Sequence, residues 1–257
     1  MTDIKKKIVL VTGASSGIGQ SCARKFAEAG AKLILVARRL DRIKTLGEEL
    51  KSLFQTETLI LGLDVRKRAD VIKKLSNLPP EWQAVEILIN NAGLSRGLDK
   101  LHEGSIDDWE EMIDTNVKGL LYVSRTVVPG MVSRGRGTII NIGSIAGQEV
   151  YPGGNVYCAS KFAVDALTRG LRLDLVDTPL RVCTVDPGLV ETEFSNVRFR
   201  GDTERAKRTY QNMTPLTPDD VADAVLFCAT RPAHVQLAQM LILPTSQASA
   251  TLVHRSQ

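Results

Sequence analysis

The residues best suited to acid–base chemistry are Tyr157 and Lys161, four positions apart in a segment with helical apolar spacing, residues 156–175. Positions i and i+4 share one face of a helix, so the lysine ammonium can lie near the tyrosine phenol. A free tyrosine has a pKa of about 10, and a neighbouring cation stabilises the phenolate. The pair predicts a general acid and base whose pKa is lowered by Lys161, although this spacing alone also occurs on many solvated helices.

A second group of residues could bind an anion. The sequence TGASSGIG, residues 12–19, follows a β-branched run and leads into a helical pattern that starts at Ile18. Glycines let the backbone turn sharply and approach a pyrophosphate at the positive end of a helix. The spacing is not the GxGxxG of the usual fingerprint, and three glycines can also simply mark a turn. The predicted cofactor contacts here are Gly13, Ser15, Ser16, Gly17, Ile18 and Gly19.

The end of the second predicted strand bears on which dinucleotide is bound. An NAD enzyme places a carboxylate there to hold the ribose 2′-hydroxyl. Here the strand is followed by Arg38 and Arg39, with no acid before Asp41. Two guanidinium groups match the geometry of a 2′-phosphate, so the sequence predicts NADP as the cofactor. The alternative is a pair of solvated arginines at a strand end.

Strands and helices that alternate along the chain must position these residues. Apolar strands alternating with amphipathic helices indicate a parallel sheet covered on both faces, the α/β doubly wound Rossmann-type fold, here with about seven strands. The predicted strands are 7–12, 32–36, 58–63, 87–90, 138–142, 181–185 and 240–243. The predicted helices are 18–29, 40–54, 107–134, 156–175 and 218–230.

One irregular segment, residues 189–217, is polar and charged and follows the sixth predicted strand. Long loops in compact domains are usually lids or binding loops, so this segment is the expected cover of the active site. No linker or repeat divides the rest of the sequence. We therefore expect residues 1–257 to form a single dinucleotide-binding catalytic domain with a substrate lid at about 189–217.

Over essentially its whole length, the sequence resembles the short-chain dehydrogenase/reductase family. The resemblance depends on several motifs in the family's order, each at the expected place relative to a strand or helix. These are residues 12–19, Asn90-Asn91-Ala92-Gly93, Asn116, Ser144, Tyr157 with Lys161, and Pro187-Gly188. Their joint occurrence favours a catalytic reading of Tyr157 and Lys161.

The resemblance implies a role for each matching position. Tyr157 would exchange a proton with the substrate oxygen, and Lys161 would also hold the nicotinamide ribose. Ser144 would hydrogen-bond the substrate oxygen, and Asn116 would hold a water in the proton relay. Further cofactor contacts implied by the family are Asp64, Val65, Asn91, Pro187, Gly188, Val190 and Thr192. For Asp64 a cap on the following helix remains an alternative.

A narrower resemblance, to the NADP-dependent 3-hydroxy acid dehydrogenases of bacteria and yeast, comes from residues 143–147, 155–161, 187–201 and the C-terminal PTSQAS and HR sequences. It implies small substrates such as serine, allo-threonine and 3-hydroxypropionate, or malonic semialdehyde. A substrate carboxylate under a lid needs a cation. The candidates are Arg198 and Arg200, with Arg96 less favoured, and each could instead be a solvated arginine.

Two other functions remain as alternatives. A short-chain reductase for bulky ketones, quinones or steroids would carry large apolar side chains in its lid, whereas residues 198–212 are charged and polar. A non-catalytic NADPH sensor would lack Tyr157, Lys161 or Ser144, and all three are present. No metal is expected, because the three histidines are scattered without ligand spacing.

Composition limits the partners and the compartment. The formal net charge of +4 is spread along the chain, so no nucleic-acid partner is indicated. The N-terminal residues lack a signal-peptide pattern, no apolar run approaches a membrane span, and the four cysteines form no CxxC pair, which together favour a cytoplasmic protein. The family resemblance also implies a homotetramer.

Overall fold

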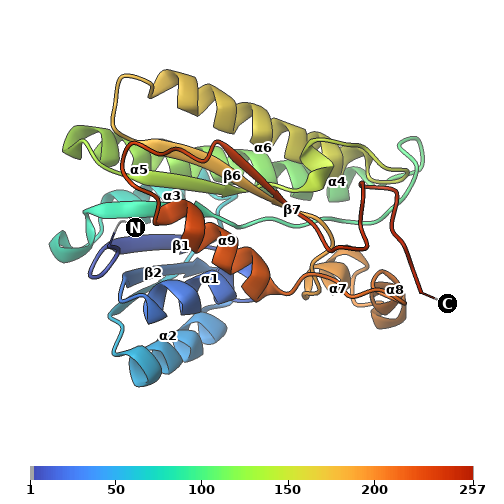
Figure 1. Cartoon of the computed structure of the whole chain (residues 1–257), viewed down its shortest axis with the longest axis horizontal. Coiled ribbons are helices and arrows are strands. Elements are labelled where there is room, and N and C mark those ends of the chain that lie inside the picture. Colours follow the sequence, from blue (N-terminus) through green and yellow to red (C-terminus); the bar gives the residue numbers. More distant parts are fainter. Residues whose placement is uncertain (1–2, 257) are drawn as a thin grey trace.

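A parallel sheet forms the centre of the protein. The computed structural model describes residues 3–256, and within them the chain forms a seven-stranded sheet in the order β3-β2-β1-β4-β5-β6-β7 (Figure 1). Every pairing between neighbouring strands is parallel. The strands are β1 (Ile8–Thr12), β2 (Lys32–Ala37), β3 (Thr58–Gly62), β4 (Val85–Asn90), β5 (Thr138–Ile142), β6 (Arg181–Pro187) and β7 (Gln239–Ile242). This confirms the predicted doubly wound Rossmann-type fold.

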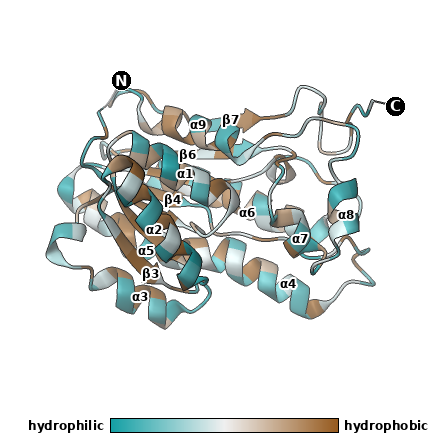
Figure 2. Ribbon diagram, turned by 90° about the horizontal axis from the view of Figure 1, so that it is seen from below, coloured by the Kyte–Doolittle hydropathy of each residue, from teal (hydrophilic) through white to brown (hydrophobic). Residues whose placement is uncertain are grey.

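Helices cover both faces of the sheet. One face packs against α1 (Gly17–Glu28), α2 (Leu40–Phe54) and α9 (Pro218–Ala229), and the other against α3 (Arg68–Ser76), α5 (Leu120–Arg134) and α6 (Asn155–Asp174) (Figure 1). Phe26 fills the first core and Met131 the second, and both are fully buried. Figure 2 shows why the strands read as continuous apolar runs: the sheet is mostly hydrophobic, whereas the helices alternate between hydrophobic and hydrophilic residues.

Two helical regions differ from the prediction. Helix α3 was not predicted, because only Val71 and Leu75 of its nine residues are buried and its apolar pattern is sparse. The helix predicted at 107–134 is divided into α4 (Ile106–Ile113), a π-helical turn (Asp114–Gly119) and α5. No residue pattern distinguishes this turn from an α-helix, since its backbone remains helical throughout.

The segment expected to be an irregular lid contains two short helices, α7 (Phe194–Arg198) and α8 (Thr203–Arg208). Asp202 caps α8 by accepting the amide hydrogen of Arg205. A bridge between Val190 and Leu216 joins the two ends of the segment. Both helices lie beyond the carboxyl end of β6, beside the C-terminal segment of the chain (Figure 1).

The parallel arrangement brings the carboxyl ends of all strands to one edge of the sheet. The strand order reverses between β1 and β4, and doubly wound folds bind ligands in the crevice at such a switch point. Single 3-10 turns lie at Pro80–Trp82 and Ile145–Gly147. No helix within residues 3–256 is both long enough and apolar enough to cross a membrane.

Candidate active site

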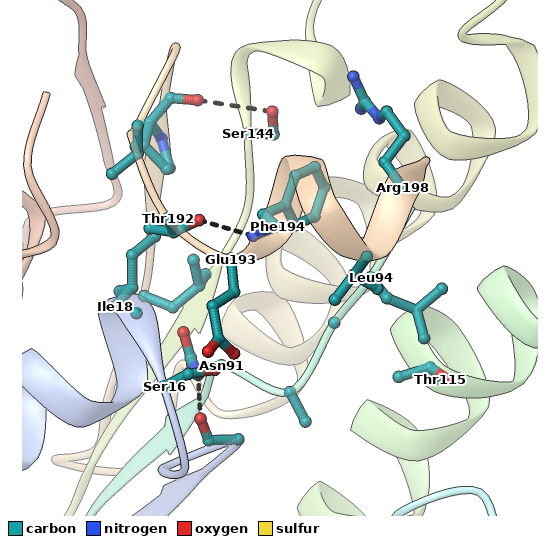
Figure 3. Close-up of a pocket in the computed structure, with 18 of the residues that line it drawn as sticks. Ser16, Ile18, Asn91, Leu94, Thr115, Ser144, Thr192, Glu193, Phe194 and Arg198 are labelled. Atoms are coloured by element: carbon teal, nitrogen blue, oxygen red, sulfur yellow. Dashed lines mark hydrogen bonds between the residues drawn. The ribbon is translucent and has the colours of Figure 1, made fainter. Parts of the chain in front are cut away.

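A cavity of about 420 Å³ opens at the carboxyl edge of the sheet. Its walls come from the glycine-rich turn, the ends of β2, β4, β5 and β6, helix α6 and the lid segment. Figure 3 shows Ser144, Phe194 and Arg198 around one end of the hollow and Ser16 and Asn91 at the other. Residues far apart in the sequence therefore face one elongated site.

Tyr157 and Ser144 meet at the inner end of this cavity. Tyr157 lies in the first turn of α6 and is buried, with the Phe194 ring edge-on at a centroid distance of 5.6 Å. Ser144 stands directly before the 3-10 turn, where its hydroxyl accepts the amide hydrogen of Ala146 at 3.1 Å. The Ser144 hydroxyl donates to the Pro187 carbonyl at 3.5 Å and is near enough to Tyr157 to lower the pKa of the phenol. Two hydroxyl groups therefore converge where a substrate oxygen could accept hydrogen bonds from both.

Lys161 lies one turn beyond Tyr157 and is also buried. Its ammonium donates to the backbone carbonyl of Ile142 at 2.8 Å and lies 5.9 Å from the centre of the Tyr157 ring. Burial lowers the pKa of Lys161 from 10.5 to about 8, and the carboxylate of Asp186 opposes this change. The helix thus places the ammonium on the predicted face, near the phenol.

The pKa of Tyr157 differs from the sequence-based expectation. Burial is the largest influence and raises the pKa of the phenol above its ordinary value of 10, and Tyr151 adds to the rise. The influences that lower this pKa are the Arg198 guanidinium and the neighbouring Ser144 hydroxyl. The expectation that Lys161 would bring this pKa below the ordinary value is wrong for this structure, because desolvation of the phenolate outweighs nearby positive charge.

Asn116 lies in the π-helical turn between α4 and α5. Its side-chain amide donates to the Leu94 carbonyl at 2.8 Å and to the Ser160 hydroxyl at 2.9 Å, and its carbonyl oxygen accepts the Leu94 amide hydrogen at 2.9 Å. Ser160 in turn donates to the carbonyl of Tyr157. Asn116 therefore ties the segment after β4 to α6, and π-helical turns of this kind are frequent at functional sites.

The glycine-rich turn is fitted closely to the segment after β4. The Asn91 side-chain amide donates to the Thr12 carbonyl at 2.9 Å, and a Cβ at Gly13 or Gly19 would lie 2.7 or 2.4 Å from that nitrogen. Gly13 and Gly17 have positive φ. Helix α1 begins with no side-chain cap on its first turn and no acidic residue there, so its free amides can receive an anion.

Arg39 connects the phosphate-binding turn to the lid. Its guanidinium donates to the Ser16 hydroxyl at 2.6 Å and to the Ser15 hydroxyl at 3.1 Å, and it pairs with Glu193 at 2.8 Å. Arg42, in the first turn of α2, pairs with the second oxygen of Glu193 at 2.7 Å. Figure 3 shows Glu193 extending from the lid toward the turn that carries Ser16.

The residues predicted to lie around the adenosine also line the cavity. Asp64 accepts the backbone amide and the guanidinium of Arg66, which lower the pKa of the carboxyl against the effect of burial. Asp64 does not cap α3, whose N-cap is Lys67, so the capping alternative is wrong. Val65 is buried nearby, Arg38 is half exposed, and the Thr115 hydroxyl is buried without a partner among the described residues. The cleft, the free helix amides and this hydroxyl fit a dinucleotide.

The segment after β6 forms the opposite wall of the cavity. Pro187, Gly188, Val190 and Thr192 all line it. A Cβ at Gly188 would lie 2.3 Å from a side-chain oxygen of Gln247, and one at Gly17 would lie 3.3 Å from the Thr192 side chain. The Thr192 hydroxyl accepts the amide hydrogen of Phe194 at 3.0 Å. This wall therefore passes close over the glycine-rich turn.

The three arginines considered for a substrate carboxylate are in different places. Arg198 lines the cavity, with its guanidinium carbon 5.3 Å from the centre of the Tyr157 ring. It donates to the hydroxyls of Ser95 at 3.0 Å and Tyr151 at 2.9 Å. Arg200 instead forms an ion pair with Asp108 away from the cavity lining, and Arg96 pairs with Glu111 at 2.7 Å. Only Arg198 of these three borders the cavity beside Tyr157.

Sequence reasoning missed three residues of the site. Arg42 could have been found from its spacing of three residues from Arg39 at the start of a predicted helix. Tyr151 and Glu193 gave no such signal, because their contacts, to Arg198 and Arg39 respectively, depend on how the lid folds over the sheet edge. Within residues 3–256, no group of three or more histidine, cysteine, aspartate or glutamate side chains could hold a metal ion.

Comparison with known proteins assigns the family. The model of the short chain dehydrogenase family matches residues 7–202, and the chain belongs to this family. An NADP-dependent 3-hydroxy acid dehydrogenase of Salmonella typhi is 50% identical over 251 residues, 97% of this chain and 100% of the relative. An NADP-dependent 3-hydroxy acid dehydrogenase of Schizosaccharomyces pombe is 45% identical over the full length of both chains.

Solved structures agree with this assignment. A closed form of serine dehydrogenase complexed with NADP⁺ superposes with a TM-score of 0.90 at 48% identity, covering 97% of this chain and 100% of the other. Serine dehydrogenase from Escherichia coli gives a TM-score of 0.81 at 43% identity, covering 94% and 99%. The resemblance found in the sequence to the family and to this subgroup is confirmed.

Proposed function

We propose that this protein is an NADP-dependent oxidoreductase that interconverts small 3-hydroxy acids, serine among them, and the corresponding 3-oxo acids. The full-length similarity to relatives named for this activity supports the proposal. The observation that carries it is Arg198, a cation that lies inside the cavity against the Tyr157 ring, where a carboxylate two bonds beyond the reacting carbon could meet it.

The cofactor would lie along the crevice, from the arginines at the end of β2 to Tyr157. Its pyrophosphate would meet the free amides of α1, and its 2′-phosphate would meet Arg39, Arg42 and Ser15. Asp64, Val65 and Asn91 would surround the adenosine, and Thr192 would face the carboxamide. NADP would supply or accept the hydride.

Residues of the protein transfer the proton to and from the substrate oxygen. In the direction of reduction, Tyr157 donates its phenolic proton to the substrate oxygen, while the Ser144 hydroxyl donates a hydrogen bond to the same oxygen. In oxidation, the Tyr157 phenolate accepts the alcohol proton. Lys161 would place a positive charge near the phenol and near the nicotinamide ribose. Asn116 holds the start of α6 in place through its hydrogen bond to Ser160. The raised pKa of Tyr157 in the free protein keeps the phenol protonated at neutral pH, which suits the acid role.

Residues 189–217 act in this proposal as the substrate lid of a single catalytic domain formed by residues 1–257. Phe194 and Arg198 reach the cavity from α7, and Tyr210 anchors the segment by donating to the Val190 carbonyl at 2.8 Å. The lid brings the Arg198 cation into the cavity beside apolar side chains such as Phe194 and Val197. This arrangement favours small acids over the bulky ketones of the alternative reductase.

We propose that the protein works in the cytoplasm as a homotetramer. All four cysteines are free and buried, which suits a reducing compartment. Apolar side chains are exposed on α5 and α6, including Leu121 and Phe162, and such surfaces fit contacts between copies of the chain. Light scattering at low protein concentration would test the assembly, and a monomer would contradict it.

The substrate class is tested by NADP⁺ reduction across a panel. The panel contains L-serine, D-serine, allo-threonine, 3-hydroxypropionate, 3-hydroxyisobutyrate, and the neutral alcohols 1-propanol and cyclohexanol. We expect kcat/KM for the best acid to exceed that for 1-propanol by about 10² or more, as expected when a charged group loses its partner. Faster turnover of the bulky neutral alcohol would overturn the substrate assignment.

A matched pair of variants tests the carboxylate site. Arg198→Gln should lower kcat/KM for 3-hydroxypropionate about tenfold or more beyond its effect on 1-propanol, because both reactions lose the guanidinium beside Tyr157 but only the acid loses a charge-assisted contact to its carboxylate. Arg200→Gln, an equal change outside the cavity, should leave both values near those of the unmodified protein. Equal losses in the two variants would remove Arg198 from this role.

A further inference from the structure

A buried carboxylate outside the family's motifs lies close to the proposed proton-transfer residues. Asp186 is the second-last residue of β6, directly before Pro187, and only 2% of it is exposed. One of its oxygens, Oδ2, accepts hydrogen bonds from three neutral side chains, those of Gln239 at 2.7 Å, Gln148 at 3.0 Å and Thr184 at 3.2 Å. A buried carboxylate is costly without a countercharge, so its presence here calls for a physical reason.

The other oxygen of Asp186 lies against the backbone that receives Lys161. A Cβ at Gly143 would lie 1.9 Å from Oδ1, so only glycine leaves room for the carboxylate there. The carbonyl of the preceding residue, Ile142, accepts the Lys161 ammonium hydrogen at 2.8 Å. One peptide at the end of β5 therefore separates a buried carboxylate from a buried ammonium.

The two charges depend on each other. Burial disfavours the ammonium of Lys161, and Asp186 is the carboxylate that opposes this effect on its pKa. Reciprocally, burial raises the pKa of Asp186, and Lys161 acts with the three hydrogen bonds to lower it. Among residues 3–256, Asp186 is the only charged group that shifts the pKa of Lys161; Tyr157 faces Lys161 from the same helix, and Arg198 faces Tyr157 from α7. A phenol and a guanidinium do not supply negative charge at neutral pH.

We propose that Asp186 is a positioning residue that keeps Lys161 in its ammonium form and directed at the Ile142 carbonyl. The proposal deepens the proposed function and rests on it for its catalytic consequence, because the proposed proton transfer uses the Lys161 positive charge, 5.9 Å from the centre of the Tyr157 ring. The carboxylate is held in place by its hydrogen bonds from Gln148, Gln239 and Thr184. The absence of a side chain at Gly143 leaves room for it. Asp186 acts only through Lys161 and touches neither substrate nor cofactor.

The experiment is a titration of Lys161 in the cofactor-free protein, followed by NMR of the ¹³Cε resonance of labelled lysine. The Lys161 signal is assigned by its loss in Lys161→Arg. In Asp186→Asn the midpoint of this titration should fall by one pH unit or more, a tenfold or greater loss of proton affinity. Thr184→Val removes a hydrogen bond to Asp186 but keeps the carboxylate, so its midpoint should stay within a few tenths of a unit of the unmodified protein.

A catalytic readout follows the same pair of variants. The pH at which kcat/KM for 3-hydroxypropionate oxidation reaches half its plateau should move upward in Asp186→Asn and stay in place in Thr184→Val. A lysine midpoint and a pH profile that are both unmoved in Asp186→Asn would overturn the proposal. If Asp186→Asn fails to fold, the coupling is measured from the other residue, because coupling between two groups is reciprocal. The Asp186 carboxyl should then titrate at higher pH in Lys161→Met than in the unmodified protein. An unchanged Asp186 midpoint would overturn the proposal.

These measurements distinguish this proposal from the proposed function. The NMR titrations need neither substrate nor cofactor, so they report on the coupling of Asp186 and Lys161 alone. Absence of NADP-dependent oxidation in the unmodified protein would contradict the proposed function while leaving the measured coupling intact. Normal oxidation with no coupling would contradict only the role of Asp186.

Discussion

Replacement of Lys161 by methionine should stabilise the cofactor-free protein at neutral pH even as it removes activity. The pKa of this lysine is lowered from 10.5 to about 8 by burial, so the folded state holds the charged form at a cost. Each unit of pKa corresponds to ~1.4 kcal/mol, which makes this cost about 3 kcal/mol. Methionine has similar length and no charge, but it leaves the Ile142 carbonyl without its donor, a loss of about 1 kcal/mol. Lys161→Met should therefore raise the free energy of unfolding at neutral pH by about 2 kcal/mol.

The stability of the unmodified protein should depend on pH because the pKa of Lys161 is about 8 in the folded state and 10.5 in the unfolded state. Below pH ~8 both the folded and the unfolded protein hold the proton, so the full cost is present. Between pH ~8 and ~10.5 the folded lysine is neutral while the unfolded lysine remains protonated, so the unfolded state binds more protons and the stability of the unmodified protein rises. The advantage of Lys161→Met should therefore be largest below pH ~8 and disappear toward pH ~10.5.

Thermal unfolding at a series of pH values is the assay. For a chain of this size, about 2 kcal/mol raises Tm by ~4–8 °C at pH 7, and the difference should shrink steadily above pH ~8. Lys44→Met, the same change at an exposed position of α2, should leave Tm within about 1 °C at every pH. A Lys161→Met protein that is less stable than the unmodified protein at pH 7, or a difference that does not vary with pH, would refute the reasoning.

Three further predictions concern the cofactor site. Replacing Arg39 and Arg42 together with alanine should weaken NADP⁺ binding about tenfold or more and leave NAD⁺ binding nearly unchanged, measured by fluorescence titration; equal losses for both would contradict a 2′-phosphate site. Glu193→Gln removes the carboxylate that pairs with both arginines in the free protein, so NADPH should bind about two- to fivefold more tightly, whereas Glu191→Gln should change nothing; weaker binding in Glu193→Gln would contradict this competition. Gly17→Ala adds a Cβ at a φ of +53° and 3.3 Å from Thr192, so it should lower stability by ~1 kcal/mol and weaken NADP⁺ binding; a Tm and affinity equal to those of the unmodified protein would show that the turn can adjust.

The framework of the fold could be predicted because its signals are local. All seven strands were predicted from short apolar runs, and helices α1, α2, α6 and α9 from their helical periodicity; parallel pairing follows from the alternation of the two. Helix α3 has too few buried residues to give that signal, and the π-helical turn around Asn116 differs from an α-helix only in its hydrogen bonding. Short lid helices such as α7 depend on packing against the sheet edge.

The site could be predicted where function depends on spacing along one element. Tyr157 and Lys161 share a helix face, and the glycines share a turn, so their arrangement follows from the sequence. The choice of Arg198 over Arg200 could not be made, because it depends on where α7 ends: Arg198 is its last residue, and Arg200 follows it with a positive φ. The rise in the pKa of Tyr157 also escaped prediction, since the degree of burial is a property of the whole fold.

The claim that Tyr157 carries the proton in NADP-dependent oxidation of a 3-hydroxy acid is tested most directly by Tyr157→Phe. The change removes the phenolic oxygen and keeps the ring that packs against Phe194 and Arg198, so folding and NADP⁺ binding should be preserved. Single-turnover oxidation of 3-hydroxypropionate at saturating NADP⁺ should then be slower by about 10² or more. A variant that binds NADP⁺ normally and oxidises the acid at the rate of the unmodified protein would contradict the account.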